Sequence, residues 1–139
     1  MNQELEIINL LDPRPMLQFS TNGSHRSVNW WNTFKELLRR DDRIEFAIDG
    51  LEDTNHIYRV NSNWQSIING VITLRNRADI YLIWRYIVFE HNYHQIQEAY
   101  ELSKELGFDQ FKLIRYANRT PNDMKLKSIT WDDAVNKLT

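Results

Sequence analysis

Residues 46–61, FAIDGLEDTNHIYRVN, place several side chains that could do chemistry directly after an apolar run. Asp49 ends the run. The carboxylates of Glu52 and Asp53 follow within ten residues, as do His56 and Arg59. The segment is therefore either a turn or one wall of a site.

The same segment also has an ordinary structural interpretation. Asp49-Gly50 is a common turn pair, because glycine adopts backbone angles that other residues avoid. In that case Arg59 would pair at the surface with Glu52 or Asp53, and such a pair contributes only about 0–1 kcal/mol. The residue types alone leave both interpretations open.

Two more polar clusters follow apolar runs, at residues 21–24 (TNGS) and 90–92 (EHN). The Asn22-Gly23 pair is typical of a turn with a positive φ angle. His91 and His94 have a spacing that can chelate a metal, but a histidine pair without further ligands is weak evidence. We therefore predict no metal site, and no catalytic residue either, since no Ser-His-Asp order or phosphate-binding glycine loop occurs.

Composition limits the class of protein. The 139 residues are 42% hydrophobic, which is typical of one folded domain. The net charge is −2 and no basic block alternates with aromatic residues, so we expect no nucleic-acid partner. We see no signal peptide and no apolar run long enough to span a membrane, and therefore expect a soluble, cytoplasmic protein without a membrane partner.

The chain contains no cysteine. Disulfides, zinc-thiolate sites and cysteine-ligated iron-sulfur clusters therefore cannot form from this chain alone.

The hydrophobic pattern predicts helices that alternate with strands. Because no tight hairpin joins the strands, we expect right-handed βαβ crossovers, a four-stranded parallel sheet and an α/β fold. The expected organisation is a single domain, with an N-terminal helix and connection at 1–15, four βα units at 16–116 and a tail at 117–139. Strands are predicted at 16–20, 43–48, 80–89 and 111–116. Helices are predicted at 4–11, 28–40, 93–106 and 131–138, and one more from about 63.

Caps and inward faces can also be read from the pattern. Ser27 and Asn92 are expected to cap helices, and Gly107 should follow the end of one. The residues predicted to face inward from the helix at 28–40 and from the helix that begins at about 63 are Trp30, Phe34, Leu37, Leu38, Trp64, Ile67, Ile68, Val71 and Ile72.

The strand at 43–48 is not apolar on both sides. Apolar and polar residues alternate along it, with Arg43 and Glu45 on the polar side. A parallel sheet that is covered by helices on both faces has nearly continuous apolar strands. The alternation therefore predicts helices on one face and a polar hollow on the other, as in a partial barrel, where Arg85 could meet Glu45.

In parallel α/β folds, ligands bind beyond the carboxyl ends of the strands. The clusters at 21–24, 49–59 and 90–92 all follow strands, so we expect them at the same end of the sheet.

Part of the chain resembles the middle and later strands of the radical S-adenosylmethionine (radical SAM) enzymes. The resemblance rests on the order and spacing of three segments, 19–24 (FSTNGS), 46–61 and 83–108 (IWRYIVFEHNYHQIQEAYELSKELGF). The resemblance implies a partial (β/α)6 barrel, of which this chain would form strands three to six. Members of that family bind a [4Fe-4S] cluster through a CxxxCxxC loop, and a Gly-Gly-Glu type motif contacts the methionyl amine.

The resemblance also implies roles for five residues. Asp49 would border the ribose and methionine parts of S-adenosylmethionine, and Arg59 would face its carboxylate. Asn22 would line the same cavity, and Val88 with Asn92 would approach the adenosine.

The chain departs from the family in its front part. The cluster loop and the Gly-Gly-Glu motif have no counterpart, and Ala47 stands where many members have a serine that contacts the cofactor. The resemblance thus implies the C-terminal part of a divided or truncated enzyme that is not catalytic alone. A cysteine-bearing partner chain would supply the cluster and the missing strands, or a homodimer would cover the open edge. The alternative is a non-enzymatic α/β interaction protein that binds a nucleotide-like ligand at the strand ends.

Overall fold

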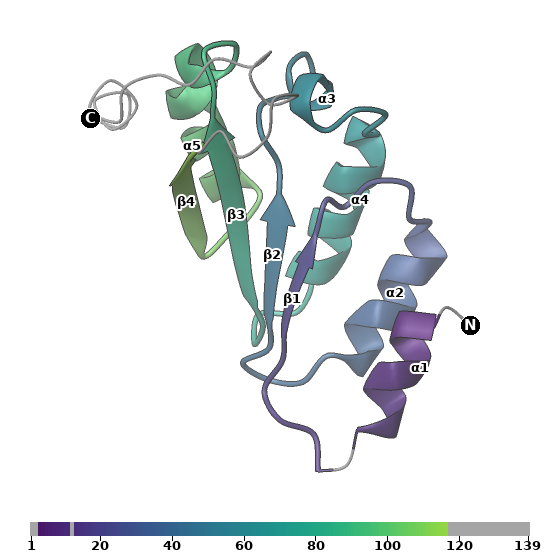
Figure 1. The fold of residues 1–139 in the computed structure, drawn as a ribbon. Coiled ribbons are helices and arrows are strands. Elements are labelled where there is room, and N and C mark those ends of the chain that lie inside the picture. The colour runs from purple at the N-terminus through teal and green to yellow at the C-terminus, as the bar shows by residue number, and fades with distance from the viewer. Residues whose placement is uncertain (1–2, 12, 117–139) are drawn as a thin grey trace.

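Four parallel strands form one sheet, and their order in the sheet is their order in the chain (Figure 1). The structure is a computed structural model that describes residues 3–11 and 13–116. The strands are β1 (Gln18–Thr21), β2 (Arg43–Ala47), β3 (Tyr81–Val88) and β4 (Gln110–Arg115). The predicted α/β fold with βαβ alternation is thus confirmed. The sheet is open and not closed into a barrel, and the helix predicted at 131–138 lies outside the described residues.

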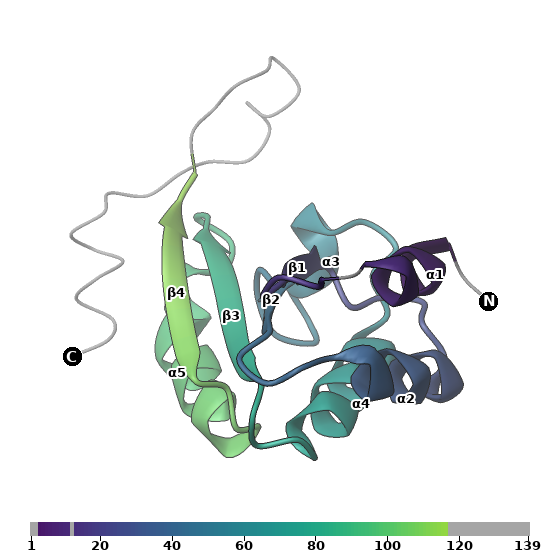
Figure 2. The same ribbon diagram turned by 90° about the horizontal axis from the view of Figure 1, so that it is seen from below.

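Helices cover one face of this sheet. Right-handed crossovers between strands in sequential order place each connecting helix on the same side. Figure 2 shows α2, α4 and α5 along that side, and α1 packs on α2. The helical segments are α1 (Gln3–Leu10), α2 (Val28–Leu37), α3 (Asn55–Tyr58), α4 (Trp64–Arg75), the 3-10 turn η1 (Tyr93–Gln95) and α5 (Ile96–Glu105). No helix in the described part of the chain is long and apolar enough to cross a membrane.

The core lies between the sheet and these helices. Trp31 of α2 is fully buried and stacks on Phe46 of β2, with ring centroids 5.7 Å apart. The sequence pattern had placed Trp30 inward, but Trp30 is only partly buried, and Trp31 takes the central position. The prediction for Ile72 was also wrong, since it is 52% exposed. The buried face of α4 is formed by Ile67, Gly70, Val71, Thr73 and Leu74.

A glycine allows α2 and α4 to approach closely. A Cβ atom on Gly70 would lie 2.4 Å from Cε2 of Trp31. Such a distance is far below a normal contact, and Trp31 has no room to move because it is fully buried. Gly70 is thus required by packing, although glycine is a poor helix former.

We expect Gly70→Ala to lower the free energy of unfolding by about 1–3 kcal/mol, because overpacked cores are strained by this amount. The sign is opposite to that of an exposed helical site, where the same change stabilises by about 1 kcal/mol. Urea unfolding measures the effect, and Ile72→Ala on the exposed side of α4 is the control. A stabilised Gly70→Ala variant would contradict the close approach.

Two predicted helix signals, the Ser27 cap and Gly107, are confirmed, and Asn63 caps α4 in the same way as Ser27 caps α2. The hydroxyl of Ser27 accepts a hydrogen bond from the Trp30 amide, and the side chain of Asn63 accepts one from the Ser66 amide. Gly107 follows α5 with a φ angle of 83°. Helix α2 ends at Leu37, earlier than predicted.

The early end of α2 is explained by a buried carboxylate just before β2. Asp42 accepts hydrogen bonds from the amides of Arg39 at 2.8 Å and Leu17 at 2.9 Å. It also forms an ion pair with Arg14, and the two side chains are 0% and 2% exposed, respectively. Asp42 thus connects the segment before β1, the end of α2 and the start of β2.

Candidate functional site

A buried carboxylate lies just after β2, at the carboxyl end of the sheet. Asp49 is fully buried, and its Oδ1 accepts a hydrogen bond from the Ile87 amide of β3 at 2.7 Å. Its Oδ2 accepts one from Nε of Arg59 at 2.7 Å. Arg59 therefore pairs with Asp49, and the surface pairing with Glu52 or Asp53 is not what the structure shows.

Burial and nearby charges shift the pKa of Asp49 in opposite directions. Burial raises the pKa of this carboxyl group, whereas the Arg59 guanidinium and the Ile87 amide lower it. Because burial is the largest effect, the pKa lies above its usual value. The carboxylate has its partners inside the protein, so its direct role is to hold Arg59 in place.

Asn92 joins β2 to β3 in the same network. Its side-chain Nδ2 donates to the carbonyl oxygens of Asp49 at 3.0 Å and Ile87 at 2.9 Å. Its Oδ1 accepts from the Phe89 amide at 2.8 Å, and its own carbonyl accepts from the hydroxyl of Tyr86 at 2.7 Å. The prediction that Asn92 caps the following helix was wrong, because its side chain bonds back to the strand ends and makes no cap hydrogen bond.

Arg59 is the member of this network that reaches solvent. Its side chain is 25% exposed, and only Nε is used by Asp49. Its two terminal nitrogens form no hydrogen bond with the described residues, and its guanidinium carbon lies 5.0 Å from the centroid of the Tyr58 ring. Arg59 can therefore offer a pair of parallel donors to a carboxylate or phosphate.

The loop between Asp49 and α3 is held by a second group of polar side chains. The amide of Asp49 donates to Oδ1 of Asn55 at 2.8 Å. The hydroxyl of Thr54 accepts from the Leu51 amide and donates to Gln95. The local sequence pattern does not single out Thr54, Asn55 or Gln95, because nothing in it indicates which polar residues of a loop are buried.

Gly50 is required in this loop. Its φ angle is 147°, and a Cβ atom would lie 2.1 Å from the hydroxyl oxygen of Thr54. The Asp49-Gly50 pair is thus both a turn and part of the candidate site.

The structure brings together three of the five residues predicted to bind a ligand, namely Asp49, Arg59 and Asn92. Val88 is 3% exposed and packs in the core, although it lies next to Ile87 of the network. Asn22 is exposed, and its Oδ1 accepts from the Ser24 amide at 3.0 Å, which is a turn within its own loop. No hydrogen bond among the described residues connects Asn22 to the network. The proposed ligand roles of all five residues stay predictions.

The face of the sheet opposite the helices carries the predicted polar pair. Nε of Arg85 lies 4.0 Å from Oε1 of Glu45, as expected from the alternation in β2. The hydroxyl of Ser20, which is the register partner of Glu45 in β1, donates to the same oxygen at 3.4 Å. This face is therefore lined by hydrogen-bonding groups in the part nearest β1 and β2.

His91 packs against a neighbouring aromatic ring. Its ring stacks on Phe89, with centroids 5.1 Å apart, and its Nε2 is buried without a hydrogen-bond partner. Burial and the nearby His94 lower the pKa of His91. Within residues 3–11 and 13–116, no group of three or more ligating side chains could hold a metal ion.

Comparison with known proteins does not identify a family. No protein-family model matches the chain, and no curated protein matches it. The resemblance to the radical SAM enzymes thus has no support from these comparisons. What the structure establishes is an α/β domain with four parallel strands.

Proposed function

We propose that the carboxyl ends of β2 and β3 bind a small ligand with a carboxylate group, and that Arg59 is its main polar contact. The observation that supports this proposal is the arrangement of Arg59. Asp49 holds its Nε, while its two terminal nitrogens bond to no described residue. A guanidinium fixed in this way loses little freedom when it binds an anion.

In its more specific form, the proposal names S-adenosylmethionine as the ligand. The chain would be the C-terminal part of a divided or truncated S-adenosylmethionine-dependent enzyme. It would not be catalytic alone, because it has no cysteine to hold a [4Fe-4S] cluster. A cysteine-bearing partner would supply the cluster and pair along the outer edge of β1, to which no described strand is paired. If no such partner exists, a homodimer would cover that edge.

The absence of cysteine also favours a second candidate function. A non-enzymatic α/β interaction protein would need no cluster, and it would bind a nucleotide-like ligand at the same strand ends. The two functions differ in how the ligand is recognised. The first requires the carboxylate of the ligand, whereas the second does not.

Isothermal titration of the purified chain with S-adenosylmethionine tests the proposal. We expect binding that Arg59→Ala weakens by about 10- to 100-fold, since a hydrogen bond to a charged group is worth about 1.5–3 kcal/mol. Arg59→Lys keeps the charge but not the fork, so it should also bind more weakly. Arg39→Ala, which removes an exposed arginine at the opposite end of the sheet, is the matched control.

Thermal unfolding of each variant must accompany the titration, because Arg59→Ala leaves Asp49 buried without its partner. Equal affinity of wild type and a folded Arg59→Lys variant would contradict the role of Arg59. Decarboxylated S-adenosylmethionine should bind poorly if the carboxylate is recognised. Equal binding of this analogue to wild type and Arg59→Ala would favour the nucleotide-binding alternative, and no binding of any probe to wild type would contradict both.

A further inference from the structure

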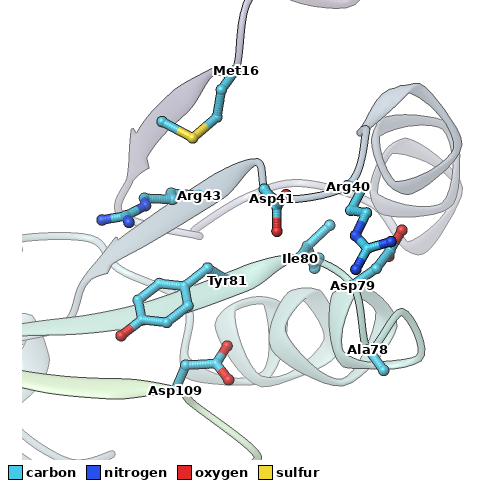
Figure 3. A pocket seen from close by; sticks show the side chains of 9 residues that line it. All are labelled: Met16, Arg40, Asp41, Arg43, Ala78, Asp79, Ile80, Tyr81 and Asp109. Carbon is cyan, nitrogen blue, oxygen red and sulfur yellow. The ribbon is translucent and has the colours of Figure 1, made fainter.

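A pocket lies at the amino end of the sheet, at the end opposite to Asp49. Its volume is about 550 Å³, which is within the usual range for small-molecule sites (Figure 3). The residues come from the segments that lead into all four strands. They are Met16, Arg40, Asp41, Arg43, Ala78, Asp79, Ile80, Tyr81 and Asp109.

Two of the three carboxylates in this pocket already have partners. Asp79 forms an ion pair with Arg77 at 2.8 Å, and Asp109 forms one with Arg75 at 2.9 Å. The Arg77 hydrogen bond lowers the pKa of Asp79. These two pairs are neutral as units, so neither carboxylate contributes a free charge to the pocket.

The remaining charges are those of Arg40, Asp41 and Arg43. None of them forms an ion pair within the described residues, although the nearby charge of Arg40 also helps to lower the pKa of Asp79. Figure 3 shows the carboxylate of Asp41 between the two arginine side chains. The backbone of Asp41 is fixed, because its amide donates to the Asp79 carbonyl at 2.8 Å and its φ angle is 69°. The guanidinium of Arg43 is stacked 5.1 Å from the centroid of the Tyr81 ring.

This order of charges, positive, negative, positive, is complementary to a ligand with two anionic groups and one cationic group. We propose that the pocket binds an acidic amino acid, such as glutamate or aspartate. Arg40 and Arg43 each contact one carboxylate, and Asp41 contacts the ammonium group. Met16, which is 58% exposed, provides the apolar surface for the methylene groups.

The proposal can be tested by titrating L-glutamate and L-aspartate into the full chain, followed by NMR shifts or calorimetry. Arg40→Gln and Arg43→Gln should each weaken binding by at least about tenfold, which is the usual value of a charged hydrogen bond. Asp41→Asn keeps a residue that tolerates a positive φ angle. This variant should lose the preference for glutamate over glutarate, which has both carboxylates but no amine.

A matched control separates this site from general charge effects. Arg39→Gln removes a neighbouring exposed arginine that does not line the pocket, and it should leave affinity unchanged. The proposal would be overturned if neither amino acid showed saturable binding at millimolar concentrations. It would also be overturned if Arg39→Gln and Arg40→Gln lowered the affinity equally.

Discussion

Asp42→Ala is expected to lower the free energy of unfolding by about 3–5 kcal/mol, the usual cost of removing one partner from a buried ion pair. The substitution leaves the Arg14 guanidinium, which is 2% exposed, without its countercharge. It also leaves the amides of Leu17 and Arg39 without their acceptor. Because a domain of this size has a total stability of about 5–15 kcal/mol, this loss is a large part of the total. Urea unfolding followed by tryptophan fluorescence measures the change.

Asp79→Ala is the matched control for this experiment. Asp79 also pairs with an arginine at the amino end of the sheet, but its side chain is 44% exposed. Exposed pairs contribute little, because water solvates both charges when the pair is broken. The stability of this variant should therefore stay close to that of wild type. If both variants lost the same free energy of unfolding, burial would not explain the contribution of the Asp42–Arg14 pair to stability.

Asn92→Asp should be the second strongly destabilising substitution, although it replaces a single NH2 group by oxygen. The carbonyls of Asp49 and Ile87 lose their donor and face a carboxyl oxygen in a fully buried position. Each unpaired buried group costs about 1–3 kcal/mol, so the two carbonyls together predict a loss of about 2–6 kcal/mol in the free energy of unfolding.

Asn32→Asp on the exposed side of α2 is the control, and its effect should be small because both forms are solvated. Chemical unfolding at neutral pH measures both variants. A stability of Asn92→Asp close to wild type would mean that the side chain of Asn92 does not bridge the two strand ends.

The alternating pattern was sufficient to predict the strands and the polar face of the sheet. In β2 the apolar residues Ile44 and Phe46 alternate with Glu45, and this alternation is a local property of the chain. The rule that ligand-binding loops follow the carboxyl ends of parallel strands also placed Asp49 and Asn92 together correctly.

Partners that are distant in sequence could not be predicted in this way. Arg14 and Asp42 are separated by 28 positions, and their pairing depends on how the segment before β1 passes the end of α2. The choice between Trp30 and Trp31 depends on the rotation of α2 relative to the sheet, because neighbouring positions differ by about 100° around a helix of 3.6 residues per turn. Likewise, Asp49 rather than Asp53 pairs with Arg59 because of a loop fold that Asn55 and Gly50 stabilise.

The two buried carboxylates on either side of β2 also protect the sheet against misalignment. Asp42 precedes the strand and Asp49 follows it, and each accepts a backbone amide from a neighbouring segment, Leu17 before β1 and Ile87 in β3. A slip of β2 by one residue would turn Phe46 toward the polar face and would detach both carboxylates from these amides. Hydrogen bonds thus hold β2 in register at both of its ends. A misaligned pairing would lose these hydrogen bonds and would also expose apolar surface.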